Sequence, residues 1–192
     1  IDEATANKIY DEMIDFAKYA FNKSHAAAYA VVSYQTAYLK YYYPVEFMAA
    51  LMTSVIDFPN KVAEYILVCR QMGIKILPPD INKGEANFSV DGGDIRYGLA
   101  AIKSIGRPVI KAIVEDREEL GLFQNLEDFI TRLSARNILN KRTIENLIKA
   151  GALDMLGGTR KQFMSIYVQI VDHVTQEKKN SMVGQMTLFD LV

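Results

Sequence analysis

Two adjacent prolines, Pro78 and Pro79, place the strongest local constraint on how this chain can fold. Neither residue has a backbone N–H group, so neither can continue a helix or donate to a strand ladder. The segment Leu77–Asp80 therefore marks a boundary. Half of the 192 residues are apolar, which suffices for a core in one domain or two small ones. We predict a mainly α-helical chain: helices before the prolines, a small β-hairpin after them, and helical hairpins beyond.

Helical spacing of apolar side chains predicts four helices in residues 1–76. Asp2 is placed to cap the first, Pro44 fits the first position of the third, and Asn60 is placed to cap the fourth. Gly73 can end the fourth helix in a left-handed conformation. The second helix is apolar nearly all round, which predicts that it is buried centrally.

The start of the second helix carries groups that suit an anion. Asn22 or Ser24 can cap this helix, and the remaining first-turn N–H groups carry the positive end of its dipole. Lys23 and His25 stand at the same end, so a phosphate would be held readily there. The alternative is an ordinary capped helix with a solvated Lys23 and a hydrogen-bonded His25.

Residues 77–98 are predicted to form a linker and a short β-hairpin. Phe88–Val90 and Ile95–Tyr97 flank Asp91–Asp94, whose Asp-Gly-Gly-Asp sequence suits a tight glycine turn. So short a pair needs packing from its neighbours. We expect it to attach the segment that follows.

Residues 99–178 are predicted to hold two helical hairpins. In the first, a short helix, a tight turn at Ile105–Gly106 and a second helix look like a helix-hairpin-helix, whose turn N–H groups bind a DNA phosphate without reading bases. Ser104 stands where the usual pattern has glycine, and a plain αα-hairpin is the alternative. The candidate DNA-binding residues of this hairpin are Lys103, Ser104, Ile105, Gly106, Arg107 and Lys111. The second hairpin is a weaker echo, with Gly151 as its turn glycine and DNA-binding candidate.

Charge is distributed unevenly, although the formal net charge is only −1. Residues 95–111 hold four basic residues and no acid, and residues 129–149 hold five basic residues and one acid, so each carries a local charge of +4. Acidic residues gather between them, in residues 115–128. This alternation predicts two basic faces separated by an acidic, solvated one, and it argues against a uniformly basic nucleic-acid coat.

The last residues, 179–192, are predicted to be a flexible polar tail that follows a helix ending near Gln176. The aliphatic-aromatic pair Leu188 and Phe189 gains little from water at a terminus and suits insertion into a partner's pocket. A tail that folds back on its own core is the alternative.

Three stretches resemble a known family, the bacterial replicative DNA polymerase III alpha subunits, or C-family polymerases. The matching stretches are Phe21–Ala26 with Tyr29–Ala30, Tyr34–Lys40, and Tyr43–Leu51, which are similar to the fingers domain of that family. The resemblance implies that residues 1–76 are the nucleotide-facing part of the fingers. It implies contacts to the incoming dNTP from Asn22, Lys23, Ser24 and His25.

The same resemblance implies that residues 99–178 are a tandem helix-hairpin-helix region gripping primed double-stranded DNA. It also implies a sliding-clamp peptide, in which a glutamine orients the strand and a terminal aliphatic-aromatic pair fills the pocket. The residues at those positions are Gln185, Met186, Thr187, Leu188 and Phe189.

For the longer protein, the resemblance implies a DNA-directed DNA polymerase with other replisome subunits as partners. Its catalytic carboxylates and Mg²⁺ would lie in a palm absent from this fragment, so we predict no catalytic residue, metal site or cofactor here, and no polymerase activity from the fragment alone. A single cysteine, Cys69, and the lack of a bilayer-spanning run predict a cytoplasmic protein without membrane contact. Two alternatives stay open: a free-standing DNA-binding helix-hairpin-helix module, and a helical interaction scaffold without a nucleic-acid role.

Overall fold

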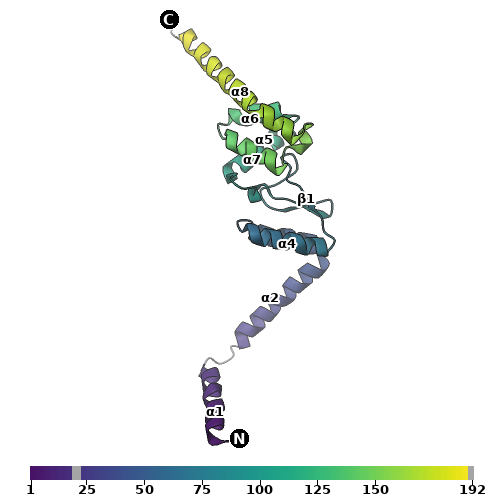
Figure 1. Cartoon of the computed structure of the whole chain (residues 1–192), viewed down its shortest axis with the longest axis vertical. Helices are drawn as coiled ribbons and strands as arrows, with labels where there is room; N and C mark the ends of the chain where they lie inside the picture. Colours follow the sequence, from purple (N-terminus) through teal and green to yellow (C-terminus); the bar gives the residue numbers. More distant parts are fainter. Residues whose placement is uncertain (19–22, 190–192) are drawn as a thin grey trace. The chain divides into compact units, whose positions relative to one another are not determined.

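The computed structural model describes residues 1–18 and 23–189 and confirms a mainly α-helical fold with a small sheet (Figure 1). Contacts divide the chain into two compact units, Ile1–Pro44 and Val45–Val192. No helix in the described residues is both long and apolar enough to cross a membrane.

The first unit contains α1 (Glu3–Lys18) and α2 (Lys23–Tyr42). Asp2 caps α1 as predicted, because its carboxylate accepts a hydrogen bond from the Thr5 backbone N–H at 2.8 Å. Thr5 thereby holds the pKa of Asp2 below its ordinary value. The predicted central burial of the second helix is wrong for this chain, since α2 has no buried residue. A helix that is apolar all round is buried only where neighbours cover every side, and the described residues supply no such cover.

Apart from Pro44, helix α3 (Pro44–Ser54) belongs to the second unit, as does α4 (Pro59–Gln71). Pro44 starts α3 and Gly73, with φ +75°, follows α4 in a left-handed conformation, both as predicted. The predicted Asn60 cap is wrong, because α4 starts one residue earlier, at Pro59. Proline is favoured at the first helical position, where its fixed φ fits and its missing N–H would have no partner.

The sheet has three short strands in the order β1-β3-β2. The predicted hairpin is confirmed as β2 (Ser89–Asp91) and β3 (Asp94–Arg96), antiparallel across two glycines with positive φ. Sequence reasoning missed β1 (Ile76–Leu77), which pairs with β3 in parallel. This strand ends where the prolines begin, so the boundary at Pro78 is also the end of a ladder.

The helical hairpins follow the sheet, and their elements are η1 (Leu99–Ala101), α5 (Arg107–Leu120), α6 (Leu126–Ala135), α7 (Lys141–Ala150), η2 (Asp154–Leu156) and α8 (Arg160–Phe189). The short helix expected before the first turn is the single 3₁₀ turn η1, and α6 was not anticipated. The expected end of the last helix near Gln176 is wrong, because α8 remains helical to Phe189.

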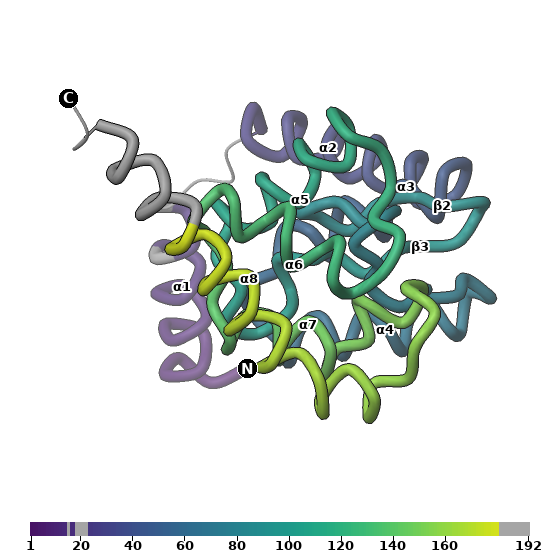
Figure 2. The backbone as a smooth tube through the Cα atoms, turned by 90° about the horizontal axis from the view of Figure 1, so that it is seen from above, coloured from purple at the N-terminus to yellow at the C-terminus, as the bar shows by residue number. Residues whose placement is uncertain are grey.

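Two hydrophobic clusters stabilise the second unit. The first joins α3 and α4 to the sheet through Met48, Met52 and Ile95, all fully buried. The second lies among α5, α6, α7 and α8, where Phe129 and Leu147 are fully buried. Figure 2 shows α6, α7 and α8 grouped together, and α8 packs on both other helices. This packing holds the two helical hairpins in one body.

Candidate nucleic-acid interface

The first hairpin turn is built around Ser104, whose φ is +64°. Side chains at positive φ are uncommon, so Ser104 adopts the conformation that glycine would supply without strain. Ile105 follows with its side chain buried, which anchors the turn to the core. Gly106 then adopts extended backbone angles and precedes α5. The turn predicted at Ile105–Gly106 is therefore present, despite the serine.

The residues of this turn that carry candidate backbone donors are exposed, apart from the buried Ile105. Gly106 is the N-cap of α5 and offers no side-chain cap. In the part of the chain that the structure describes, the N–H groups of Ser104, Gly106 and Arg107 donate to no acceptor. A Cβ built on Gly106 would meet only the Pro108 ring, at 3.6 Å. Free N–H groups at the positive end of a helix form an anion site when an anion can approach them.

Exposed cations flank these donors. Lys103 and Arg107 are exposed, and no described carboxylate lies within ion-pair distance of either cation. Lys111, one turn along α5, lies 3.5 Å from Glu115. The structure thus brings together the candidates from Lys103 to Arg107, with Lys111 beside them and partly neutralised.

The second hairpin turn differs from the first. Gly151 has φ +82° and is buried, and its N–H donates to the Ile148 carbonyl at 3.0 Å. A Cβ at Gly151 would clash with Nη2 of Arg160, so the guanidinium covers this glycine. Asp154 holds that guanidinium, with Nη2 to Oδ2 at 2.6 Å. Gly151 shapes the turn, and Arg160 is the exposed group there that sequence reasoning missed. Its signal was a basic residue directly after the helix-capping Thr159.

The second predicted basic face is wrong in its first two members. Arg132 and Arg136 turn inward and bind Asp116, which is only 2% exposed. The distances from Asp116 to the two Nε atoms are 2.6 and 3.2 Å. The acidic segment is accordingly not a solvated face at Asp116. Bonds from Arg136 to Glu119 and Asp116 also raise the pKa of Arg136. These charges join α5 to α6.

The first predicted basic face also loses a member. Arg96 is buried, where it donates to Asp91 through Nε at 3.0 Å and to the Pro78 carbonyl at 2.9 Å. Its hydrogen bond is the main reason why the pKa of Asp91 is lowered. Arg96 therefore fixes the β-hairpin against the proline boundary instead of facing a ligand.

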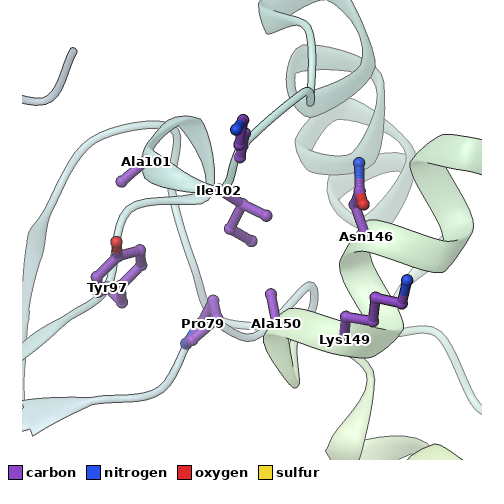
Figure 3. Close-up of a pocket in the computed structure, with 8 residues that line it drawn as sticks. Pro79, Tyr97, Ala101, Ile102, Asn146, Lys149 and Ala150 are labelled. Atoms are coloured by element: carbon purple, nitrogen blue, oxygen red, sulfur yellow. The ribbon is translucent and has the colours of Figure 1, made fainter. Parts of the chain in front are cut away.

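A cavity of about 470 Å³ lies beside the first turn (Figure 3). Lys103 and Ile102 line it from the turn, and α7 lines it through Asn146 and Lys149. Tyr97 forms a further wall. Burial raises the pKa of Tyr97 above its ordinary value.

The remaining predicted residues are placed as follows. Lys23, Ser24 and His25 lie exposed in the first turn of α2, while Asn22 lies outside the described residues. The His25 ring packs against the Tyr29 ring at a tilt of 43°, with centroids 4.4 Å apart. The clamp-peptide positions 185–189 have helical backbone in α8, and their side chains lie outside the described residues. Among the described residues, no group of three or more His, Cys, Asp or Glu side chains could hold a metal ion.

Comparison with known proteins first defines a class: residues 73–163 match the family model described as the helix-hairpin-helix motif. The matching segment contains both turns described above. The chain is also 45% identical to DNA polymerase III subunit alpha of Mycobacterium tuberculosis H37Rv over 186 residues, which are 97% of this chain and 16% of the relative.

Two further relatives carry the same name. DNA polymerase III subunit alpha of Escherichia coli K12 is 45% identical over 193 residues, covering 100% of this chain and 17% of the relative. That of Thermus aquaticus is 48% identical over 166 residues, covering 86% and 14%. The resemblance seen in the sequence is confirmed: the chain corresponds to a segment of DNA polymerase III alpha subunits, and it spans about one sixth of the relatives' length.

Proposed function

We propose that this chain is the part of a bacterial replicative DNA polymerase that grips duplex DNA by its sugar-phosphate backbone. The observation that carries the proposal is the first hairpin turn, where the backbone N–H groups of three exposed residues donate to no described acceptor and Lys103 and Arg107 have no described carboxylate partner. The names of the relatives indicate DNA as the ligand of this anion site, since a DNA polymerase must hold a primed duplex.

The chemistry of this site is independent of base sequence. The N–H groups of Ser104, Gly106 and Arg107 donate to phosphate oxygens, and the two side chains add positive charge to the contact. Gly106 lets the backbone come close to the phosphate because no Cβ stands in the way. Such contacts position a duplex in the polymerase without selecting a sequence.

Two finer assignments belong to the same proposal. The start of α2 binds the triphosphate of an incoming dNTP through Lys23, Ser24 and His25, with Asn22 beside them. Support comes from the positive end of this helix, its exposed side chains and the resemblance to the fingers of the family. Residues 185–189 bind a sliding clamp, as the likeness of their sequence to a clamp-binding peptide suggests.

The whole-protein activity is proposed as DNA-directed polymerisation in the bacterial cytoplasm, with other replisome subunits as partners. Paired carboxylates and Mg²⁺ of a palm would supply the chemistry, and this chain would supply substrate contacts. Robust Mg²⁺-dependent nucleotide incorporation by the 192-residue chain alone would overturn this division of labour.

The test of duplex grip measures binding of a fluorescent blunt duplex to the whole chain at several salt concentrations. The double variant K103A/R107A should weaken binding at least about tenfold at low salt and reduce the salt slope by about 2. The control R70A/K75A removes two exposed cations elsewhere in the second unit and should change neither quantity much. Equal losses of affinity in both variants would show that binding depends only on overall charge and not on this turn. A chain that binds no duplex at all would favour the scaffold alternative.

A further inference from the structure

The cavity beside the first turn has features that duplex grip does not use. Its floor is apolar, formed by Pro79, Ala101, Ile102 and Ala150. Figure 3 shows Pro79 and Tyr97 on one side of the space and Asn146, Lys149 and Ala150 of α7 on the other. Its volume of about 470 Å³ lies in the range of small-ligand pockets. Both alanines are short, and this leaves the space open.

The polar groups around this floor match a nucleobase. Tyr97 presents an aromatic wall, and its ring is held edge-on by Phe88, with centroids 5.1 Å apart. The Asn146 side chain makes no hydrogen bond to any described residue, so its amide can both donate to and accept from a base edge. An aromatic face with a neighbouring amide is a sequence-tolerant platform for one base.

The charge at the rim matches a phosphate. Lys103 and Lys149 line the cavity from opposite elements, and none of the lining residues is acidic. Lys149 pairs with Glu145 on its own helix, whereas Lys103 has no described carboxylate partner. Lys103 belongs both to this cavity and to the hairpin turn. A strand whose phosphate lies at the turn would therefore deliver its next nucleotide to the cavity.

We propose that this cavity is a subsite for one unpaired nucleotide of a DNA strand, with its base on the apolar floor beside Tyr97. The inference rests on the proposed function, because the turn supplies the adjoining phosphate contact. It adds a preference that duplex grip lacks: the chain should distinguish a duplex end that carries a single-stranded extension from a blunt end.

The first experiment uses the unaltered chain and three fluorescent duplexes of equal length: blunt, with a five-nucleotide overhang, and with the same overhang made of abasic sites. The natural overhang should bind at least about fivefold more tightly than the abasic one, because stacking one base contributes that much or more. Equal affinity for the natural and abasic overhangs would show that only phosphates are held, and would overturn the subsite.

The second experiment removes the free amide from the cavity. The variant N146L replaces it with an apolar side chain of nearly the same shape that cannot hydrogen-bond a base edge, and it should abolish the preference for the natural overhang while leaving blunt-duplex affinity unchanged. The control Q169L makes the same amide-to-leucine change on an exposed position of α8 and should keep the preference. Circular dichroism checks that both variants fold. A preference that survives N146L, or that is lost equally in Q169L, would contradict the proposal.

These outcomes separate the two proposals. If blunt duplex binds and depends on Lys103 and Arg107 but the overhang adds nothing, the subsite fails and the duplex grip stands. If no duplex binds, both fail together.

Discussion

At the residue scale, Ser104 shows how a site can keep its geometry with an unfavourable side chain. Its φ of +64° is forced by the turn, because Ile105 must enter the core and Gly106 must start α5. Asn137 is the other described non-glycine residue with positive φ, and asparagine tolerates it better. The strain at Ser104 therefore lies directly in the proposed phosphate contact.

Replacing Ser104 by glycine should relieve this strain. The free energy of unfolding of S104G should rise by up to about 1 kcal/mol. The left-handed conformation costs a residue with a side chain about 1–2 kcal/mol, and glycine offsets part of that gain because it increases the conformational entropy of the unfolded chain. Urea unfolding monitored by circular dichroism measures it. The control S165G, within α8, should lower the free energy by about 0.5–1 kcal/mol. Destabilisation of S104G to the same extent would contradict this account.

At the element scale, the helices and the β-hairpin were predictable, and the missed features depend on tertiary contacts. Asp2, Pro44 and Gly73 act through local backbone chemistry, so the sequence predicts them. β1 was missed because two residues carry no periodicity and its partner β3 lies about 20 residues away. The two basic faces were misjudged because counting charges along the chain does not show that Arg132 and Arg136 both turn onto Asp116.

The candidate site was also predictable only where it depends on neighbouring residues. Neighbouring residues around Ser104 come together because they share one turn. The cavity was not anticipated, since it joins Tyr97, the turn and α7 across some 50 residues of sequence. The cover of Arg160 over Gly151 was missed for the same reason, because it depends on where α8 begins.

Asp116 should be a major stabilising contact between α5 and α6. The variant D116N removes the buried charge that two guanidinium groups share and should lower the free energy of unfolding by about 3 kcal/mol, because both groups lose their most buried partner. Urea denaturation measures it. Glu119 also binds Arg136, but its side chain is 63% exposed, so E119Q should cost less than about 1 kcal/mol. Similar losses in the two variants would show that the buried pair is not the main tie.

At the scale of the whole molecule, duplex grip and clamp capture should be separable. The variant L188A/F189A removes the apolar pair of the proposed clamp peptide and should abolish capture by an immobilised sliding clamp, because those side chains would fill its pocket. Its affinity for blunt duplex should not change. Surface plasmon resonance measures the first quantity and fluorescence anisotropy the second.

The control for that experiment is M182A/V183A, which shortens two apolar side chains just before the peptide and should retain clamp capture. Loss of duplex binding together with clamp capture would show that the tail and the hairpins act as one site.

The length of α8 has a consequence for how its two ends would work together. Val174 is the last residue of this helix that is buried among those whose side chains the structure describes, and a helical backbone carries Leu188 about 20 Å beyond it. A continuous helix of this kind sets both the distance and the rotational orientation of a partner bound at its end. Two residues inserted before Gly184 would rotate residues 185–189 by about 200° around the helix axis and lengthen the helix by only about 3 Å. Seven inserted residues would nearly restore the original orientation. A partner bound to residues 185–189 would thus be held at one rotational angle relative to the DNA.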